Sequence, residues 1–127
     1  MDRRLKKMAR IIAVQERLHQ LAELKVAALD REKTELESGE ESLIQALNHD
    51  DGLQGLFIEA MARRLAVLAR DRERVGRALE TETGRMFAEA LRLKQMERMS
   101  EKVRQDYLRE LWKRGFEDLL DTLPVGD

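Results

Sequence analysis

The strongest constraint on the fold is a seventy-residue stretch, from Leu53 to Thr122, that contains no proline and is rich in strong helix formers. The only proline of the chain, Pro124, comes just after it. Apolar residues recur along the stretch at alternating steps of three and four, which is the spacing of one helix face. As a single helix it would measure roughly 105 Å, at about 1.5 Å per residue. The rest of the chain must therefore pack against this helix.

The first half of the chain carries an apolar stripe of its own. The stripe runs through Leu5, Met8, Ile12, Gln15, His19, Ala22, Val26, Leu29, Lys33, Leu36, Glu40, Leu43 and Leu47, and nine of these thirteen residues are apolar. A second apolar row, formed by Ile11, Val14, Leu18 and Leu21, lies beside the stripe near the N-terminus. The wider face at that end can bury more than one partner helix.

Polar, turn-forming residues at 48–52 interrupt the pattern. Asp51, followed by Gln54, suits a helix N-cap with its capping-box partner. We therefore expect one domain over residues 1–127, with helices at about 2–47 and 53–122 and a turn between them. Such a short connection between two long helices favours antiparallel neighbours.

The second half carries the matching stripe. It consists of Ile58, Met61, Leu65, Leu68, Arg72, Val75, Leu79, Glu82, Met86, Glu89, Leu93, Met96, Ser100, Val103 and Tyr107. A repeat of this length predicts a left-handed coiled-coil seam, and polar residues within it weaken packing but favour one register. The predicted fold is all-α: a long antiparallel two-helix coiled-coil hairpin with the second helix longer than the first.

Charge agrees with this fold. Folding the chain about Asp51 sets residues 30–41, with a net charge of −4, against residues 61–72, with a net charge of +3. Opposite signs then meet, although each exposed ion pair contributes less than about 1 kcal/mol.

The same construction makes the open end of the hairpin basic on both helices, and this end should attract an acidic surface. The residues concerned are Arg3, Arg4, Lys6, Lys7 and Arg10 on the first helix, and Arg92, Lys94 and Arg98 on the second.

The predicted first helix begins opposite about position 100 of the second helix. Beyond that position the second helix continues unpaired for about twenty residues. Its unpaired apolar residues are Tyr107, Leu108, Leu111, Trp112, Phe116, Leu119, Leu120 and Leu123. An apolar segment of that size predicts a partner. Two occupants stay open at this point: a different protein, or a second copy of the chain in a dimeric bundle.

Several function classes find no support in the sequence. There is no cysteine, and neither His19 nor His49 has a nucleophile or a second imidazole at a useful spacing, so we expect no enzyme, no metal and no cofactor. His49 with Asp50 and Asp51 is explained more simply as a turn than as a metal site.

Nucleic acid and membranes are also disfavoured as partners. The arginine-rich residues 63–77 include no aromatic side chain for base stacking, and the net charge of the chain is −1. No run approaches the roughly 18 apolar residues that cross a membrane. The basic N-terminal segment has an apolar face that is better used against the second helix than on a lipid surface. We expect a cytoplasmic protein without membrane insertion.

A family resemblance appears in the last helix, in the sequence MERMSEKVRQDYLRELWKRGFEDLLD of residues 96–121. With the antiparallel hairpin and its basic open end, it resembles the FliJ/YscO-type proteins of flagellar and type III secretion export machines. The spacing that carries the likeness is that of Lys102, Tyr107, Glu110, Arg114, Leu120 and Asp121.

The resemblance implies a stalk similar to the central subunit of a rotary ATPase. Its base, residues 3–10 with residues 92–123, would enter the pore of the hexameric export ATPase. Its shaft would reach an export gate protein through off-seam apolar residues such as Phe57, Val67 and Phe87. The expected function is a non-enzymatic stalk that stimulates the ATPase and couples it to the gate. The alternative is a self-associating coiled-coil scaffold with no ATPase partner.

Overall fold

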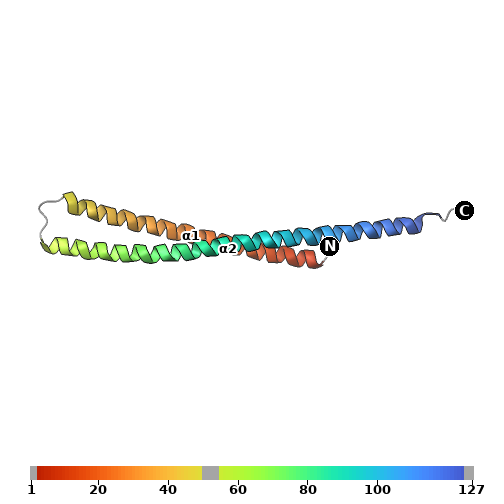
Figure 1. The fold of residues 1–127 in the computed structure, drawn as a ribbon, viewed down its shortest axis with the longest axis horizontal. Helices are drawn as coiled ribbons and strands as arrows, with labels where there is room; N and C mark the ends of the chain where they lie inside the picture. Colours follow the sequence, from red (N-terminus) through yellow and green to blue (C-terminus); the bar gives the residue numbers. More distant parts are fainter. Residues whose placement is uncertain (1–2, 50–54, 125–127) are drawn as a thin grey trace. The chain divides into compact units, whose positions relative to one another are not determined.

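The computed structural model describes residues 3–49 and 55–124, which form two α-helices followed by Leu123 and Pro124. Helix α1 spans Arg3–His49 and α2 spans Gly55–Thr122, and no strand occurs in these ranges (Figure 1). The helices pack against each other, and α2 has 68 residues against 47 in α1. The structure thus confirms an all-α helical hairpin whose second helix is the longer.

The expected turn differs from the structure at its start. Asn48 and His49 belong to the last turn of α1, whereas residues 50–54 lie outside the described residues. A histidine in the last turn of a helix faces the negative end of the helix dipole, which favours continuing the helix through it. Helix α2 also runs without a break through Gly76, Gly84 and Gly115.

The chain divides into two compact units, and each helix contributes to both. Unit 1 combines Met1–His19 with Glu89–Asp127, and unit 2 is Gln20–Ala88. Within each unit a segment of α1 packs on a segment of α2. Unit 1 therefore combines an early and a late segment of the chain, whereas unit 2 is built from its middle.

The predicted stripe of α1 is confirmed residue by residue. All thirteen of its positions are buried or half-buried, and every other described residue of α1 except Gly39 is exposed. In unit 2, Ala22 is 4% exposed and the α2 residue Val75 is completely buried. The seam is thin, because two helices bury only one narrow face each.

The stripe of α2 follows the prediction at thirteen of fifteen positions. The exceptions are Ile58, in the first turn of α2, and Arg72. Ile58 lies at the start of α2, at the edge of the described part of the seam. Arg72 is exposed because its long side chain carries the guanidinium to the rim of the seam, where water reaches it.

The register obtained by folding about Asp51 was wrong in detail, although the acidic and basic segments do meet. Between the helices of unit 2, Arg72 Nε lies 2.7 Å from Glu40 Oε1, in a close ion pair without an aligned hydrogen bond. Folding about Asp51 had set Arg72 against residue 30. Gly39 also packs beside the Leu68 side chain, whose methyl would lie 3.6 Å from an added Cβ. Packing of the seam therefore sets the register, and the charges adjust to it.

Candidate protein-binding surfaces

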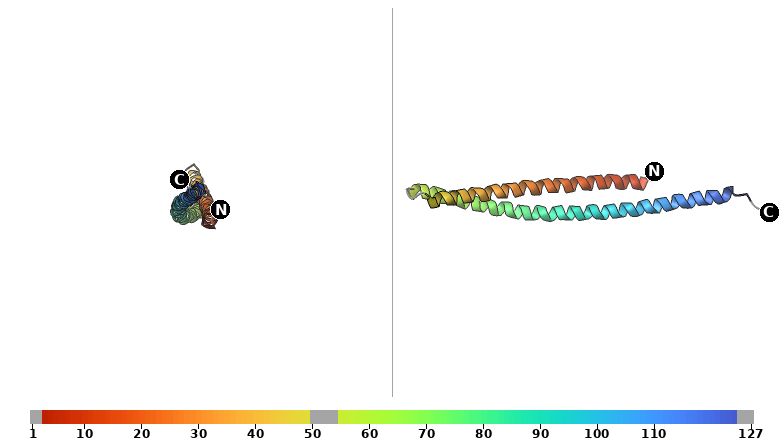
Figure 2. Two further views of the ribbon diagram at one scale, coloured as in Figure 1. Left: turned by 90° about the vertical axis from the view of Figure 1, so that its right-hand side faces the viewer. Right: turned by 90° about the horizontal axis from the view of Figure 1, so that it is seen from above.

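The most exposed apolar surface lies at the end of α2, in unit 1. Val103 lines a groove with Arg4, close to the start of α1, and Tyr107 is the last half-buried residue of α2. Every residue from Leu108 to Pro124 is exposed. Figures 1 and 2 show this segment of α2 continuing past the first turn of α1. We call residues 108–123 the C-terminal overhang.

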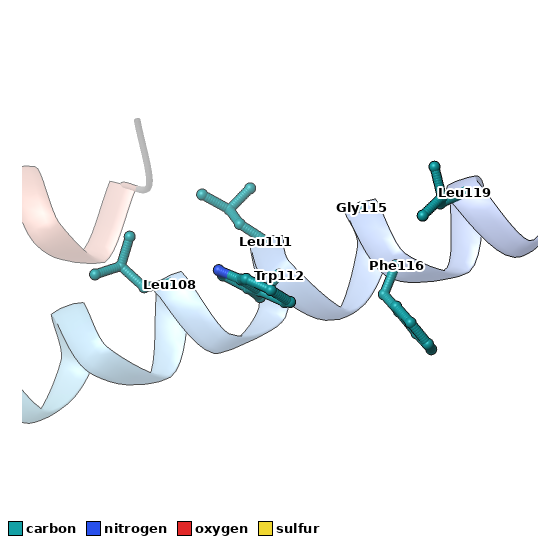
Figure 3. A pocket seen from close by; sticks show the side chains of 6 residues that line it. All are labelled: Leu108, Leu111, Trp112, Gly115, Phe116 and Leu119. Atoms are coloured by element: carbon teal, nitrogen blue, oxygen red, sulfur yellow. The ribbon is translucent and has the colours of Figure 1, made fainter.

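Large apolar side chains cover one side of the overhang. Trp112 is 78% exposed and Leu119 is 59% exposed. The other exposed members are Leu108, Leu111, Phe116, Leu120 and Leu123. Gly115 lies among them and leaves a shallow hollow between Leu111 and Leu119 (Figure 3). An added Cβ at Gly115 would meet nothing within 4 Å. The predicted partner-binding residues of the overhang, apart from Tyr107, thus lie together on about one half of the helix surface.

This face points away from the seam. Successive helix residues are about 100° apart, so the middle of the apolar face, at Trp112 and Gly115, is turned by roughly 120° from the seam at Val103 and Tyr107. Tyr107 itself belongs to the seam and is half-buried. A longer α1 that continued along the seam would therefore leave much of the overhang face uncovered.

The basic residues of α1 surround a neighbouring surface in unit 1. Arg4 and Lys7 line an apolar groove between the helices, whose floor is made by Met8, Ile11, Ile12, Met96, Met99 and Val103. Arg3 and Arg10 line an adjacent hollow with Lys7. Lys6 is exposed on the same turns of α1. The predicted basic cluster of α1 is thus brought together, and it borders an apolar groove.

The basic residues of α2 are less concentrated. Arg92 Nη1 lies 3.3 Å from Glu89 Oε1, one turn away on the same helix, so part of its charge is compensated. Lys94 and Arg98 are exposed. Both lie roughly opposite the seam by helix geometry, away from the groove.

Sequence reasoning did not identify the groove itself. Met99 lies outside the predicted stripe and is 61% exposed. The second apolar row of α1, to which Ile11 belongs, could have indicated the groove. Such a row lies beside the seam, so α2 alone does not cover it and a further neighbour is needed. Methionine side chains adapt to partners of different shape, which suits a binding groove.

A polar contact crosses the seam of unit 1. Gln15 is 4% exposed, and its Nε2 donates to the backbone oxygen of Glu89 at 3.1 Å and to the Glu89 carboxylate. Arg92 also donates a hydrogen bond to this carboxylate. A buried polar pair of this kind fixes which residues of α1 and α2 face each other.

The residues proposed for a gate contact do not form one patch. Phe57, Val67 and Phe87 are 56%, 47% and 65% exposed, and all lie on α2 in unit 2. At about 100° per residue, Val67 and Phe87 point in directions roughly 160° apart. Each is accessible, but they do not share a surface.

The described residues contain no group of three or more histidine, aspartate, glutamate or cysteine side chains that could hold a metal ion. His19 lies half-buried in the seam, and His49 is exposed at the end of α1. Asp50 and Asp51, the neighbours of His49 in the turn, lie outside the described residues. Within the described ranges, neither helix is long and apolar enough to cross a membrane.

Comparisons with protein-family models, with curated proteins and with solved structures give no match to this chain. Its function is therefore inferred from the chemistry of the surfaces described above.

Proposed function

We propose that the protein is a helical hairpin that works by binding another protein through its C-terminal overhang. The observation that carries the proposal is the exposed apolar face of residues 108–123, which no other described residue of unit 1 covers. Trp112 and Phe116 are the central candidates, since aromatic side chains dominate the energetics of protein interfaces.

The size of the exposed face supports a stable complex. Burying a large apolar side chain completely contributes about 1.5–3 kcal/mol relative to leaving it in water. Trp112, Phe116 and Leu119 are all more than half exposed, so a partner that covers them gains several such contributions. The overhang is already helical, so ordering of the backbone costs little upon binding.

The partner class we propose is the hexameric export ATPase of a flagellar or type III secretion apparatus. Three features support it: the resemblance of residues 96–121 to FliJ/YscO-type proteins, the apolar overhang, and the basic start of α1 in the same unit. In this proposal the overhang and the basic cluster enter the ATPase ring. The protein acts as a non-enzymatic stalk that stimulates ATP hydrolysis and couples it to an export gate protein.

The experiment mixes the full chain with the cognate export ATPase and measures co-elution and ATP hydrolysis. We expect a complex and faster hydrolysis with the unchanged chain. Both effects are lost when Trp112 and Phe116 become glutamate, because two charges then replace the apolar anchors. Both also weaken when Arg3, Arg4, Lys6 and Lys7 become glutamate.

The matched control replaces Glu110 by glutamine, since Glu110 lies on the side of the overhang helix opposite the apolar face. This variant should bind and stimulate as the unchanged chain does. Unchanged hydrolysis in the presence of the full chain would contradict the stalk proposal. The second candidate, a self-associating scaffold, is favoured by one specific feature, the separation of charge along the overhang.

A further inference from the structure

Basic and acidic residues are segregated along the C-terminal overhang, whose apolar face runs from Leu108 to Leu123. Residues 109–114 hold Arg109, Glu110, Lys113 and Arg114, with a net charge of +2. Residues 117–121 hold Glu117, Asp118 and Asp121, with a net charge of −3. One half of the overhang is therefore basic and the other half is acidic.

The apolar face is also symmetric about its centre. Its positions are 108, 111, 112, 115, 116, 119, 120 and 123. Their spacing is the same in both chain directions, so the centre of symmetry lies between residues 115 and 116. In an antiparallel pair of such helices, Leu108 of one copy lies opposite Leu123 of the other, and Trp112 lies opposite Leu119. Gly115 and Phe116 of the two copies meet at the centre, where the absent side chain leaves room for the ring.

We propose that the overhang binds the overhang of a second copy of this chain, as an antiparallel helix pair with two-fold symmetry. This arrangement sets each basic half beside an acidic half, whereas a parallel pair would set like charges against each other. A two-fold interface uses the same patch on both copies, which the symmetric apolar face provides.

The length of the overhang fits this pairing. The facing segments end at Leu108 and Leu123, and the last seam residue of α2, Tyr107, lies directly before Leu108. The intrachain seam of each copy thus begins where the contact between copies stops. The stems of Arg109 and Lys113 can cover apolar residues at the rim while their charges stay in water.

The inference rests on the second candidate function, self-association, and specifies its interface; it needs no ATPase. Both partners use the same face, so a second copy and a different protein exclude each other on it. Dimerisation would then withhold the overhang until a competing partner displaces the second copy.

The test measures sedimentation equilibrium of the full chain alone over a wide range of concentrations. We expect a reversible monomer–dimer equilibrium. Reversing the basic half, with Arg109, Lys113 and Arg114 replaced by glutamate, should weaken the dimer at least tenfold. Reversing the acidic half, with Glu117, Asp118 and Asp121 replaced by lysine, should weaken it similarly.

Mixing the two reversed chains should restore dimers, because each acidic segment then meets a basic one. Circular dichroism of each variant checks that helix content is unchanged. A chain that stays monomeric at every concentration would overturn the proposal, as would reversed chains that dimerise as well alone as when mixed. An unchanged chain that stays monomeric but still stimulates the ATPase would overturn this inference and leave the proposed function standing.

Spin labels distinguish antiparallel from parallel pairing, and the chain has no cysteine of its own to interfere. Asp106→Cys and Glu110→Cys place labels on the side away from the pair. In the antiparallel dimer the two labelled residues are displaced along the axis by about 29 Å at position 106 and about 17 Å at position 110. The label separation should therefore be larger at position 106. Equal separations at the two positions would indicate a parallel pair and refute the arrangement.

Discussion

Replacing Gln15 by leucine tests whether the buried polar contact of unit 1 holds α1 and α2 together. The Gln15 side chain donates from one nitrogen to the backbone oxygen and to the carboxylate of Glu89. Leucine has a similar volume, so the change leaves no large cavity but faces the carboxylate with a methyl group. The variant isolates the loss of these hydrogen bonds.

The expected cost follows from these two bonds. A neutral hydrogen bond contributes about 1 kcal/mol, and one to a charged group about 1.5–3 kcal/mol. The Glu89 side chain is 12% exposed and keeps its ion pair with Arg92, which reduces the penalty. We expect Gln15→Leu to lower the free energy of unfolding by about 2 kcal/mol.

The double variant sharpens this prediction. Glu89→Leu alone leaves the Gln15 amide buried without its carboxylate partner and should cost about 1–3 kcal/mol. Gln15→Leu together with Glu89→Leu replaces the polar pair by an apolar one and should return the stability to near that of the unchanged chain. Urea unfolding followed by circular dichroism measures all four proteins.

The control is Gln95→Leu, an exposed position on α2 in the same unit, which should change stability by less than about 0.5 kcal/mol. If the effects of the two single variants simply add in the double variant, Gln15 and Glu89 are not coupled. The interpretation of this contact as a register-setting pair would then be refuted.

Three further predictions concern unit 2, and each is measured by chemical unfolding. Val75→Ala should cost roughly 1–3 kcal/mol because Val75 is completely buried, whereas Val67→Ala, at a position 47% exposed, should cost less than about 0.5 kcal/mol; equal losses would contradict the burial pattern. Gly84→Ala should stabilise α2 by up to about 1 kcal/mol, since an added Cβ meets nothing within 4 Å and alanine favours the helix; a loss of stability would indicate an unrecognised contact. Arg72→Gln should cost less than about 1 kcal/mol, because its side chain is 45% exposed, and the cost should shrink at high salt; a salt-independent loss would mean that Arg72 acts through packing against Glu40 and its neighbours.

Periodicity predicted most of the fold because a two-helix pair has only one way to bury a single stripe on each helix. Every stripe position of α1, from Leu5 to Leu47, is covered in the structure. The register was predicted less well. Folding about Asp51 set Arg72 against residue 30, whereas Arg72 pairs with Glu40, at the other end of the same acidic segment. Charge could not correct this, because flexible charged side chains can pair across several registers at little cost.

The candidate surfaces were predictable to different degrees. The unpaired overhang followed from comparing the two helix lengths, and Trp112 and Phe116 lie on its exposed face. The groove beside Met99 was not predicted, because it depends on how two side-chain rows from different helices lie next to each other. Single-helix patterns contain no such information. The same applies to the separation of Phe57, Val67 and Phe87 onto different faces.

The division into two units has a consequence for synthesis of the chain. Unit 1 needs residues 3–19 and residues beyond Glu89, so its first segment leaves the ribosome long before its partner segment exists. At about 5–20 residues per second, that segment waits for several seconds with Met8 and Ile12 uncovered. Unit 2 can close on itself during this interval. Fragments that stop before Glu89 should therefore aggregate through their first helical turns, even where unit 2 has folded.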